Sequence, residues 1–138
     1  MVKNHKTRKL NPKFGFLGIL GFAGFLGIWT YQIDREVFPF IFFAFFGFFG
    51  FFFEGKMSNT LMDERYAENK KNAQLHALRT GFSISAATLL VSSWGWLFRS
   101  NDAKLLFVTI SLSFAYALVI FLSEYLLYRF DCVDSVEE

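Results

Sequence analysis

EGKMSNTLMDERYAENKKNAQLHALR, residues 54–79, is the only long polar stretch between two strongly apolar halves of the chain. Asp63, Glu64 and Glu68 are acids that come early in it, and Lys70, Lys71 and Arg79 are bases that come late. In a helix this order interacts favourably with the macrodipole. We therefore expect a helix that runs from about Leu61 into the apolar residues beyond Arg79. Thr60 should cap this helix, with Asp63 at its third position in a capping-box arrangement. The chain is thus organised around one polar helix held between two pairs of apolar segments.

The composition indicates a membrane protein. Of the 138 residues, 54% are hydrophobic and 21 are Phe, which is more than a soluble core of this size needs. The formal net charge of +2 is too small to suggest a nucleic-acid partner. Cys132 is the one cysteine, so an intrachain disulfide and a cysteine-rich metal site are excluded. We expect a single all-α, polytopic membrane domain that covers residues 1–138.

Four apolar segments mark the expected transmembrane helices, namely residues 14–31, 38–53, 81–98 and 105–128. Short polar links join the first to the second and the third to the fourth, which makes two hairpins. Segment 54–79 joins the hairpins, and its helix should extend the third span. Asn11 and Pro12 supply a break before the first span, while Pro39 falls in the first turn of the second, where proline is tolerated.

Small residues recur every third position in the first span, as Gly15, Gly18, Gly21, Gly24 and Gly27. In an ideal α-helix each such step falls about 60° short of a full turn, so this stripe should wind around the axis. The second span repeats the pattern with Ala44, Gly47 and Gly50, and eleven of its sixteen residues are Phe. Small residues allow close approach in lipid, so we expect the two helices to pack along slanted grooves. Simple repeat expansion of Gly and Phe is the alternative explanation.

Charge predicts the orientation in the membrane. Eleven of the 14 basic residues precede the first span, lie in segment 54–79 or follow the fourth span. The positive-inside rule therefore places both termini and this segment in the cytoplasm, in a protein of the cell membrane. Aromatic residues fall at both ends of the expected spans: Trp29, Tyr31, Trp94 and Trp96 at the outer ends, and Tyr125 and Tyr128 at an inner end.

No catalytic, cofactor-binding or metal-binding motif stands out, so we expect no enzymatic activity. His5 and His76 have no ligand partner at a helical spacing. Glu124 near the end of the fourth span is the intramembrane polar candidate, because an acid inside a span is a functional candidate by default. Alternatively, it reaches the interface and pairs with Arg129 about one turn away.

A resemblance adds one expectation. Asn11-Pro12, followed by Phe14-Gly15-Phe16-Leu17-Gly18 and further Gly-Phe-Leu-Gly repeats, resembles the start of a family of small prokaryotic membrane proteins of unknown function. The triplet Asp63-Glu64-Arg65, followed by two more spans, is also similar to that family. Its members are often encoded beside Cro/C1-type helix-turn-helix regulators. By association, the resemblance implies a membrane partner for a transcription factor, and it implies no catalytic residues.

The leading functional hypothesis is a non-enzymatic membrane partner or sensor that binds a soluble regulator through its cytoplasmic helix, without direct contact with nucleic acid. The expected contacts are Met62, Asp63, Glu64, Tyr66 and Glu68. An apolar stripe on that helix (Met62, Tyr66, Ala73, Ala77) could cover lipid headgroups, the bundle or the partner. The alternative is an immunity or resistance protein against a membrane-active peptide, and a small transporter or channel subunit is a weaker one. Homo-oligomer formation is left open.

Overall fold

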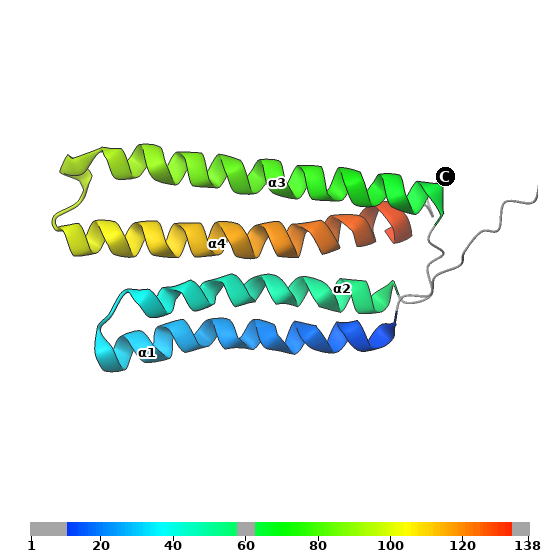
Figure 1. The fold of residues 1–138 in the computed structure, drawn as a ribbon, viewed down its shortest axis with the longest axis horizontal. Helices are drawn as coiled ribbons and strands as arrows, with labels where there is room; N and C mark the ends of the chain where they lie inside the picture. Colours follow the sequence, from blue (N-terminus) through cyan, green and yellow to red (C-terminus); the bar gives the residue numbers. More distant parts are fainter. Residues whose placement is uncertain (1–10, 58–62, 134–138) are drawn as a thin grey trace, which may run out of the picture.

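The computed structural model describes residues 11–57 and 63–133, and every regular element in these ranges is helical (Figure 1). The expected all-α class is thus confirmed. Thr60, Leu61 and Met62 lie outside the described residues, as does His5.

The helices of the described residues form four rods. The first rod is the 3-10 helix η1 (Pro12–Phe25) continued by α1 (Leu26–Asp34), and the second is the 3-10 helix η2 (Phe38–Gly50) continued by α2 (Phe51–Lys56). The third rod is α3 (Glu64–Ser93), and a short turn with η3 (Gly95–Leu97) leads to α4 (Asn101–Tyr128). The π-helix η4 (Arg129–Val133) ends the described chain.

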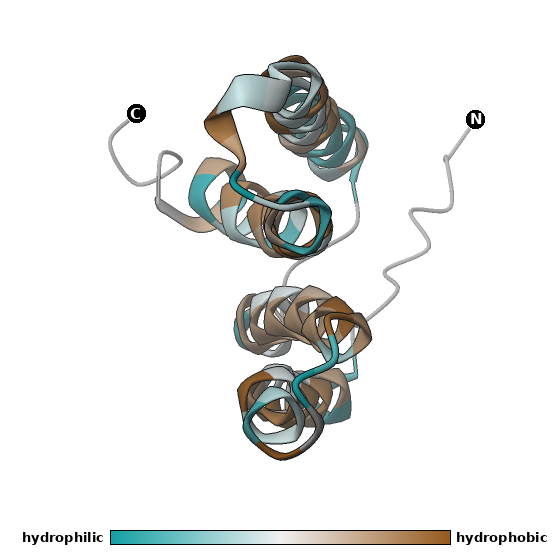
Figure 2. Ribbon diagram, turned by 90° about the vertical axis from the view of Figure 1, so that its left-hand side faces the viewer, coloured by the Kyte–Doolittle hydropathy of each residue, from teal (hydrophilic) through white to brown (hydrophobic). Residues whose placement is uncertain are grey.

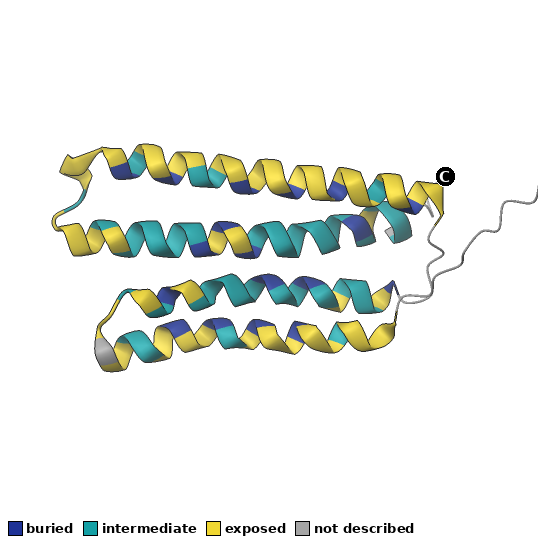
Figure 3. Ribbon diagram, viewed as in Figure 1, coloured by how far each residue is buried: buried dark blue, intermediate teal, exposed yellow. Residues whose placement is uncertain are grey.

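The rods lie side by side in one row, in the order first rod, second rod, α4, α3 (Figures 1 and 2). They form the two expected hairpins, and the hairpins meet where the second rod packs against α4. Buried residues follow the seams between neighbouring rods, whereas exposed residues cover much of the remaining surface (Figure 3). The architecture is therefore an open layer rather than a closed four-helix bundle.

The glycine stripe of the first rod is straight, which corrects the expected winding. The 3-10 helices η1 and η2 have three residues per turn, so side chains at positions i and i+3 lie one above the other. The three middle glycines each face one ring of the second rod, in the pairs Gly18–Phe52, Gly21–Phe49 and Gly24–Phe46. Gly27, at the end of the stripe, lies against the Pro39 carbonyl oxygen and the Phe43 ring. A Cβ atom on Gly24 would lie 2.6 Å from the Phe46 ring. The close packing was predicted, but it follows a straight ladder instead of slanted grooves.

The second rod uses another face for the second hairpin. A Cβ atom on Gly47 would lie 2.8 Å from the carbonyl oxygen of Ala117, and one on Gly50 would lie 3.0 Å from the Cα atom of Phe121. Period-three spacing thus gives this rod a phenylalanine face for the first rod and a glycine face for α4. Phe rings at i and i+3 contact one another along the rod and complete its surface, with centroids 5.3 to 6.3 Å apart.

Most helix boundaries near proline match the expectation. The Asn11 side chain accepts a hydrogen bond from the Lys13 amide at 3.1 Å, and Pro12 begins η1. Pro39 lies in the first turn of η2. The first rod extends to Asp34, however, three residues beyond the expected end of the first span, so the link to the second rod is confined to Arg35–Val37.

The boundaries of the second hairpin differ more. Asp63 is the N-cap of α3, and its carboxylate accepts a hydrogen bond from the Tyr66 amide at 2.8 Å, so it does not occupy the third helical position. At the other end α3 stops at Ser93, five residues before the expected end of the third span. The polar residues before Leu105 are the first turn of α4, capped by the Ser100 hydroxyl, rather than a loop.

Within the described residues, three helices are long and apolar enough to cross a membrane: Pro12–Ile33, Phe38–Lys56 and Asn101–Cys132. These correspond to the first, second and fourth expected spans. The apolar part of α3 that begins at Gly81 ends at Ser93 and covers about 20 Å at about 1.5 Å per residue. The hydrocarbon core of a bilayer is about 30 Å thick. Because α3 stops at Ser93, the apolar part of the third expected span is shorter than the hydrocarbon core is thick.

Candidate functional site at the start of α3

One end of the layer gathers most of the polar residues that the sequence singled out. Here the end of the second rod, the start of α3 and the end of α4 come together, at the right-hand side of Figure 1. We call this region the polar end and define it as residues 54–57, 63–70 and 124–133. The turns Arg35–Val37 and Trp94–Ser100 lie at the opposite end.

The polar end is built on a small hydrophobic core. Met57 is fully buried, Tyr66 is 5% exposed, and both pack in one cluster with Ala73 and Leu127. Ala77 is also fully buried. The described part of the expected apolar stripe is therefore buried inside the protein and is not available to a partner.

The acids at the start of α3 remain at the surface. Asp63, Glu64 and Glu68 are all exposed, and Asp63 also holds the first turn of the helix through its cap. Tyr66 was grouped with them as a partner contact, but its burial makes it a core residue. The structure thus separates the five expected contacts: three exposed acids, one buried tyrosine, and Met62, which lies outside the described residues.

Negative charge surrounds the buried tyrosine. Burial raises the pKa of Tyr66 above its ordinary value of 10.0, and the carboxylates of Glu124, Glu54 and Asp131 raise it further. Tyr66 is therefore a neutral phenol at physiological pH.

Asn69 was not identified from the sequence. Its amide donates hydrogen bonds to the Phe130 carbonyl oxygen at 3.5 Å and to Asp131 Oδ1 at 3.3 Å. These bonds tie the second turn of α3 to η4. The pairing depends on how α3 and α4 align, so no local sequence pattern could indicate it.

Glu124 is half-buried and faces the second rod. A Cβ atom on Gly50 would lie 3.3 Å from the Glu124 Cβ atom, and the charges of Glu54 and Lys70 act on the Glu124 carboxyl group. Nearby, the Lys56 ammonium lies 5.6 Å from the ring centroid of Phe53 and 5.7 Å from that of Tyr128. The pairing of Glu124 with Arg129 stays a prediction.

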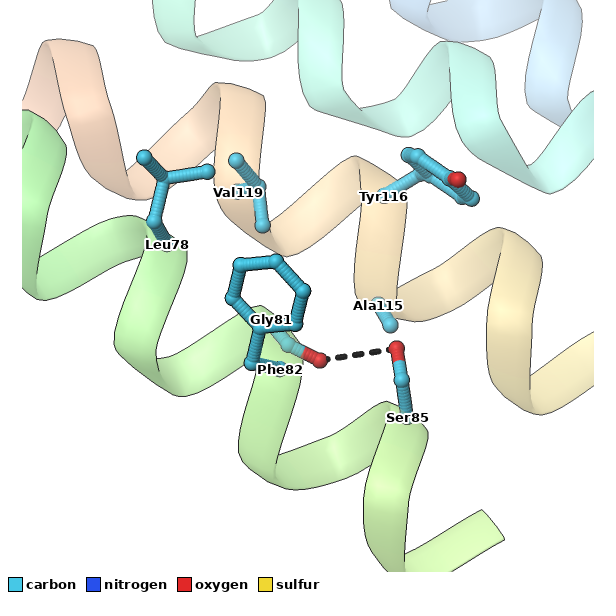
Figure 4. Close-up of a pocket in the computed structure, with 7 residues that line it drawn as sticks. All are labelled: Leu78, Gly81, Phe82, Ser85, Ala115, Tyr116 and Val119. Atoms are coloured by element: carbon cyan, nitrogen blue, oxygen red, sulfur yellow. Dashed lines mark hydrogen bonds between the residues drawn. The ribbon is translucent and has the colours of Figure 1, made fainter. Parts of the chain in front are cut away.

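The seam between α3 and α4 carries a shallow apolar groove of about 140 Å³ (Figure 4). Gly81 lies against Val119 at its base, and Phe82 and Tyr116 stand at its sides. The Ser85 hydroxyl donates a hydrogen bond to the Gly81 carbonyl oxygen at 2.9 Å. The other hydroxyls of the apolar half of α3 also bond to carbonyls of their own helix: Ser83, Thr88, Ser92 and Ser93. They stabilise the helix locally and do not line a polar path.

The described ranges contain no candidate metal site. Within residues 11–57 and 63–133, no group of three or more His, Cys, Asp or Glu side chains is placed to hold a metal ion. His76 is exposed, and its ring centroid lies 6.5 Å from that of Phe130. Cys132 is half-buried beside the hydrophobic cluster.

The part of the chain that the structure describes is all-helical, and three of its helices are long and apolar enough to cross a membrane. No protein-family model matches the chain, and no curated protein or solved structure matches it either. The resemblance to the Gly-Phe-Leu-Gly-repeat family therefore stays a prediction.

Proposed function

We propose that the protein is a multi-pass protein of the cell membrane in which all four rods cross the bilayer. Three helices have the necessary length and hydropathy, and α3 packs along α4, which supports its crossing beside them. The open layer adds support, because large apolar side chains of the first rod face outward: Phe16, Phe22 and Phe25 are 71%, 60% and 54% exposed. In lipid such a surface is covered by acyl chains.

The proposed orientation has both termini and residues 54–79 in the cytoplasm. The described chain begins at the polar end and also finishes there, which supports placing both termini on one side. The distribution of basic residues supports the cytoplasmic choice for that side, since eleven of 14 belong to the termini and to the central segment.

The proposed role is that of a non-enzymatic membrane partner or sensor for a soluble regulator. One observation carries this role: α3 buries the described part of its apolar stripe inside the protein while it leaves Asp63, Glu64 and Glu68 exposed. The start of the helix is thereby held firmly and presents negative charge to the cytoplasm. A basic surface, such as that of a DNA-binding protein, is the complementary partner, and its binding should weaken as salt increases.

The test reverses charge without disturbing the cap. Glu64→Lys combined with Glu68→Lys should abolish co-purification of a basic soluble protein after gentle detergent extraction. Asn72→Lys is the matched control, because it adds positive charge to an exposed position of the same helix. Asp63→Ser should keep the cap and weaken binding only partly. Retention of the partner by the double variant, or absence of any basic soluble partner with the wild type, contradicts the proposed role.

A second candidate is immunity against a membrane-active peptide. The exposed Phe side chains on the outer edge of the first rod favour it, because a peptide within the bilayer could pack there. Expression should then protect cells from such a peptide, and the charge reversals at Glu64 and Glu68 should leave protection intact. The transporter or channel hypothesis gains no support, since the hydroxyls of α3 are used within their own helix.

A further inference from the structure

The end of the layer opposite the polar end contains a recess of about 740 Å³. It lies between the turn that joins the first two rods and the first turns of α4. Exposed tryptophans mark the same end of the molecule, with Trp29 68% and Trp96 83% exposed. Tryptophan is enriched at the level of lipid headgroups. On the proposed membrane arrangement, the recess therefore opens at the outer headgroup layer.

The recess is lined by both charged and apolar side chains. Arg35, Glu36 and Asp102 contribute one positive and two negative side chains, all of them exposed. Among the described residues, no ion pair joins Arg35 to either carboxylate. Phe38 and Leu105 supply apolar walls and are 73% and 57% exposed. The recess thus offers separate positions for an anion, a cation and a hydrocarbon segment.

We propose that this recess binds a phospholipid whose headgroup carries both a phosphate and a primary amine. Arg35 would bind the phosphate, because a guanidinium matches phosphate geometry and donates charge-assisted hydrogen bonds. Glu36 and Asp102 would accept hydrogen bonds from the ammonium group. The glycerol and the upper acyl chains would contact Phe38 and Leu105. This inference rests on the proposed membrane insertion but not on the proposed regulator.

The same charges predict which lipids are disfavoured. A phosphocholine headgroup carries a positive charge but has no N–H to donate to the carboxylates. A phosphoglycerol headgroup has no positive charge, so Glu36 and Asp102 would repel its phosphate. The expected order of retention is therefore ethanolamine first, choline second and glycerol last.

The backbone at Arg35 adds an independent observation. Its φ of 57° lies in the left-handed region, and no other non-glycine residue in the described ranges has a positive φ. The position is the C-cap of α1, where the Arg35 amide donates a hydrogen bond to the Tyr31 carbonyl oxygen at 3.0 Å. Glycine is the residue that usually fills such a position. An arginine fills this strained position and lines the recess.

The experiment measures which lipids remain bound to the purified protein. The full chain is reconstituted into vesicles with equal amounts of phosphatidylethanolamine, phosphatidylcholine and phosphatidylglycerol, extracted gently, and examined by native mass spectrometry. The wild type should retain phosphatidylethanolamine about tenfold over phosphatidylglycerol, a difference of about 1.4 kcal/mol. Glu36→Gln with Asp102→Asn should remove this preference, and Arg35→Gln should reduce retention of all three lipids. Lys104→Gln is the matched control, since it removes a positive charge at the same end but outside the recess lining.

Each outcome decides the inference. The headgroup site is contradicted if the wild type retains the three lipids in the proportions of the vesicles. It is also contradicted if the Glu36 and Asp102 variant keeps the preference for phosphatidylethanolamine. Both results leave the proposed membrane protein standing if the chain resists alkaline extraction from membranes. Release of the wild type by alkaline extraction would instead overturn the membrane insertion together with the site.

Discussion

The left-handed backbone conformation of Arg35 should lower the stability of the protein, and substitutions at this residue can test this. Arg35 has a left-handed backbone conformation, which costs a non-glycine residue about 1–2 kcal/mol. A glycine at this position would avoid that cost, but it would lose more conformational entropy on folding, so the net stabilisation is smaller. Arg35→Gly should therefore raise the free energy of unfolding by roughly 0.5–1 kcal/mol in detergent. Arg35→Ala, the control, keeps the strained conformation and should bring no gain. A lower melting temperature for Arg35→Gly than for Arg35→Ala would contradict this account.

Tyr66 makes stability depend on alkaline pH. Its folded-state pKa is raised above 10.0 by burial and then by the neighbouring carboxylates, whereas the unfolded chain ionises near the ordinary value. The unfolded state thus loses its proton first, so stability is fully present below about pH 10 and is lost as pH rises through the folded-state pKa.

Thermal unfolding of the wild type between neutral pH and about pH 11 should show this decline. Tyr66→Phe keeps the ring in the hydrophobic cluster and removes the titrating group, so its curve should be flatter. Parallel curves for the two proteins would show that Tyr66 is not the group responsible.

The residues of the candidate site were only partly predictable. Exposed acids such as Glu64 and Glu68 followed from the sequence, because charged residues at a helix start favour solvent. The burial of Tyr66 and the bonds of Asn69 did not follow, since both depend on the alignment of α3 with α4 and with η4.

At the scale of elements, the glycine ladder predicts graded effects. Gly21→Ala would place a methyl group 2.7 Å from the Phe49 ring, which must shift, and should cost about 1–3 kcal/mol. Gly47→Ala should cost more, because its methyl group meets the backbone of Ala117, which cannot rotate away. Gly95→Ala is the control, with no atom within 4 Å of the new methyl group. Chemical or thermal unfolding in detergent measures all three.

Phe49→Leu in the Gly21→Ala background should recover part of the loss, because a smaller side chain makes room for the methyl group. Equal stability of all three glycine variants would favour simple repeat expansion as the origin of the stripe.

The sequence revealed the period of three but not its geometry. Long 3-10 helices are uncommon, so an α-helix was the reasonable expectation. In an α-helix the glycine stripe would wind around the axis, whereas in the observed 3-10 helices it forms a straight face. The pairing of the two rods resolves the difference, because glycines and Phe rings of equal spacing face each other only when both rods have three residues per turn. The early end of α3 at Ser93 likewise depends on the turn to α4 and not on a local stop signal.

The whole molecule yields a prediction of topology. In a Cys132→Ser background, single cysteines at Asp34 and Asn101 should react with an impermeant thiol reagent on intact cells, because both lie at the proposed outer end. A cysteine at Lys70 should react only after the membrane is permeabilised. Labelling of the Lys70 position from outside would contradict four crossings with cytoplasmic termini, and it would point to a different path for α3.

The 3-10 winding also changes how far each residue reaches. A residue advances about 2.0 Å in a 3-10 helix and about 1.5 Å in an α-helix. The second rod, from Phe38 to Lys56, therefore spans about 35 Å, where an all-α rod of the same sequence would span about 28 Å. The 3-10 rod therefore exceeds the thickness of a hydrocarbon layer, about 30 Å, by roughly 5 Å, whereas the all-α rod would only just match it. Tight winding thus lets a short segment, rich in Phe and Gly, exceed the thickness of that layer without added residues.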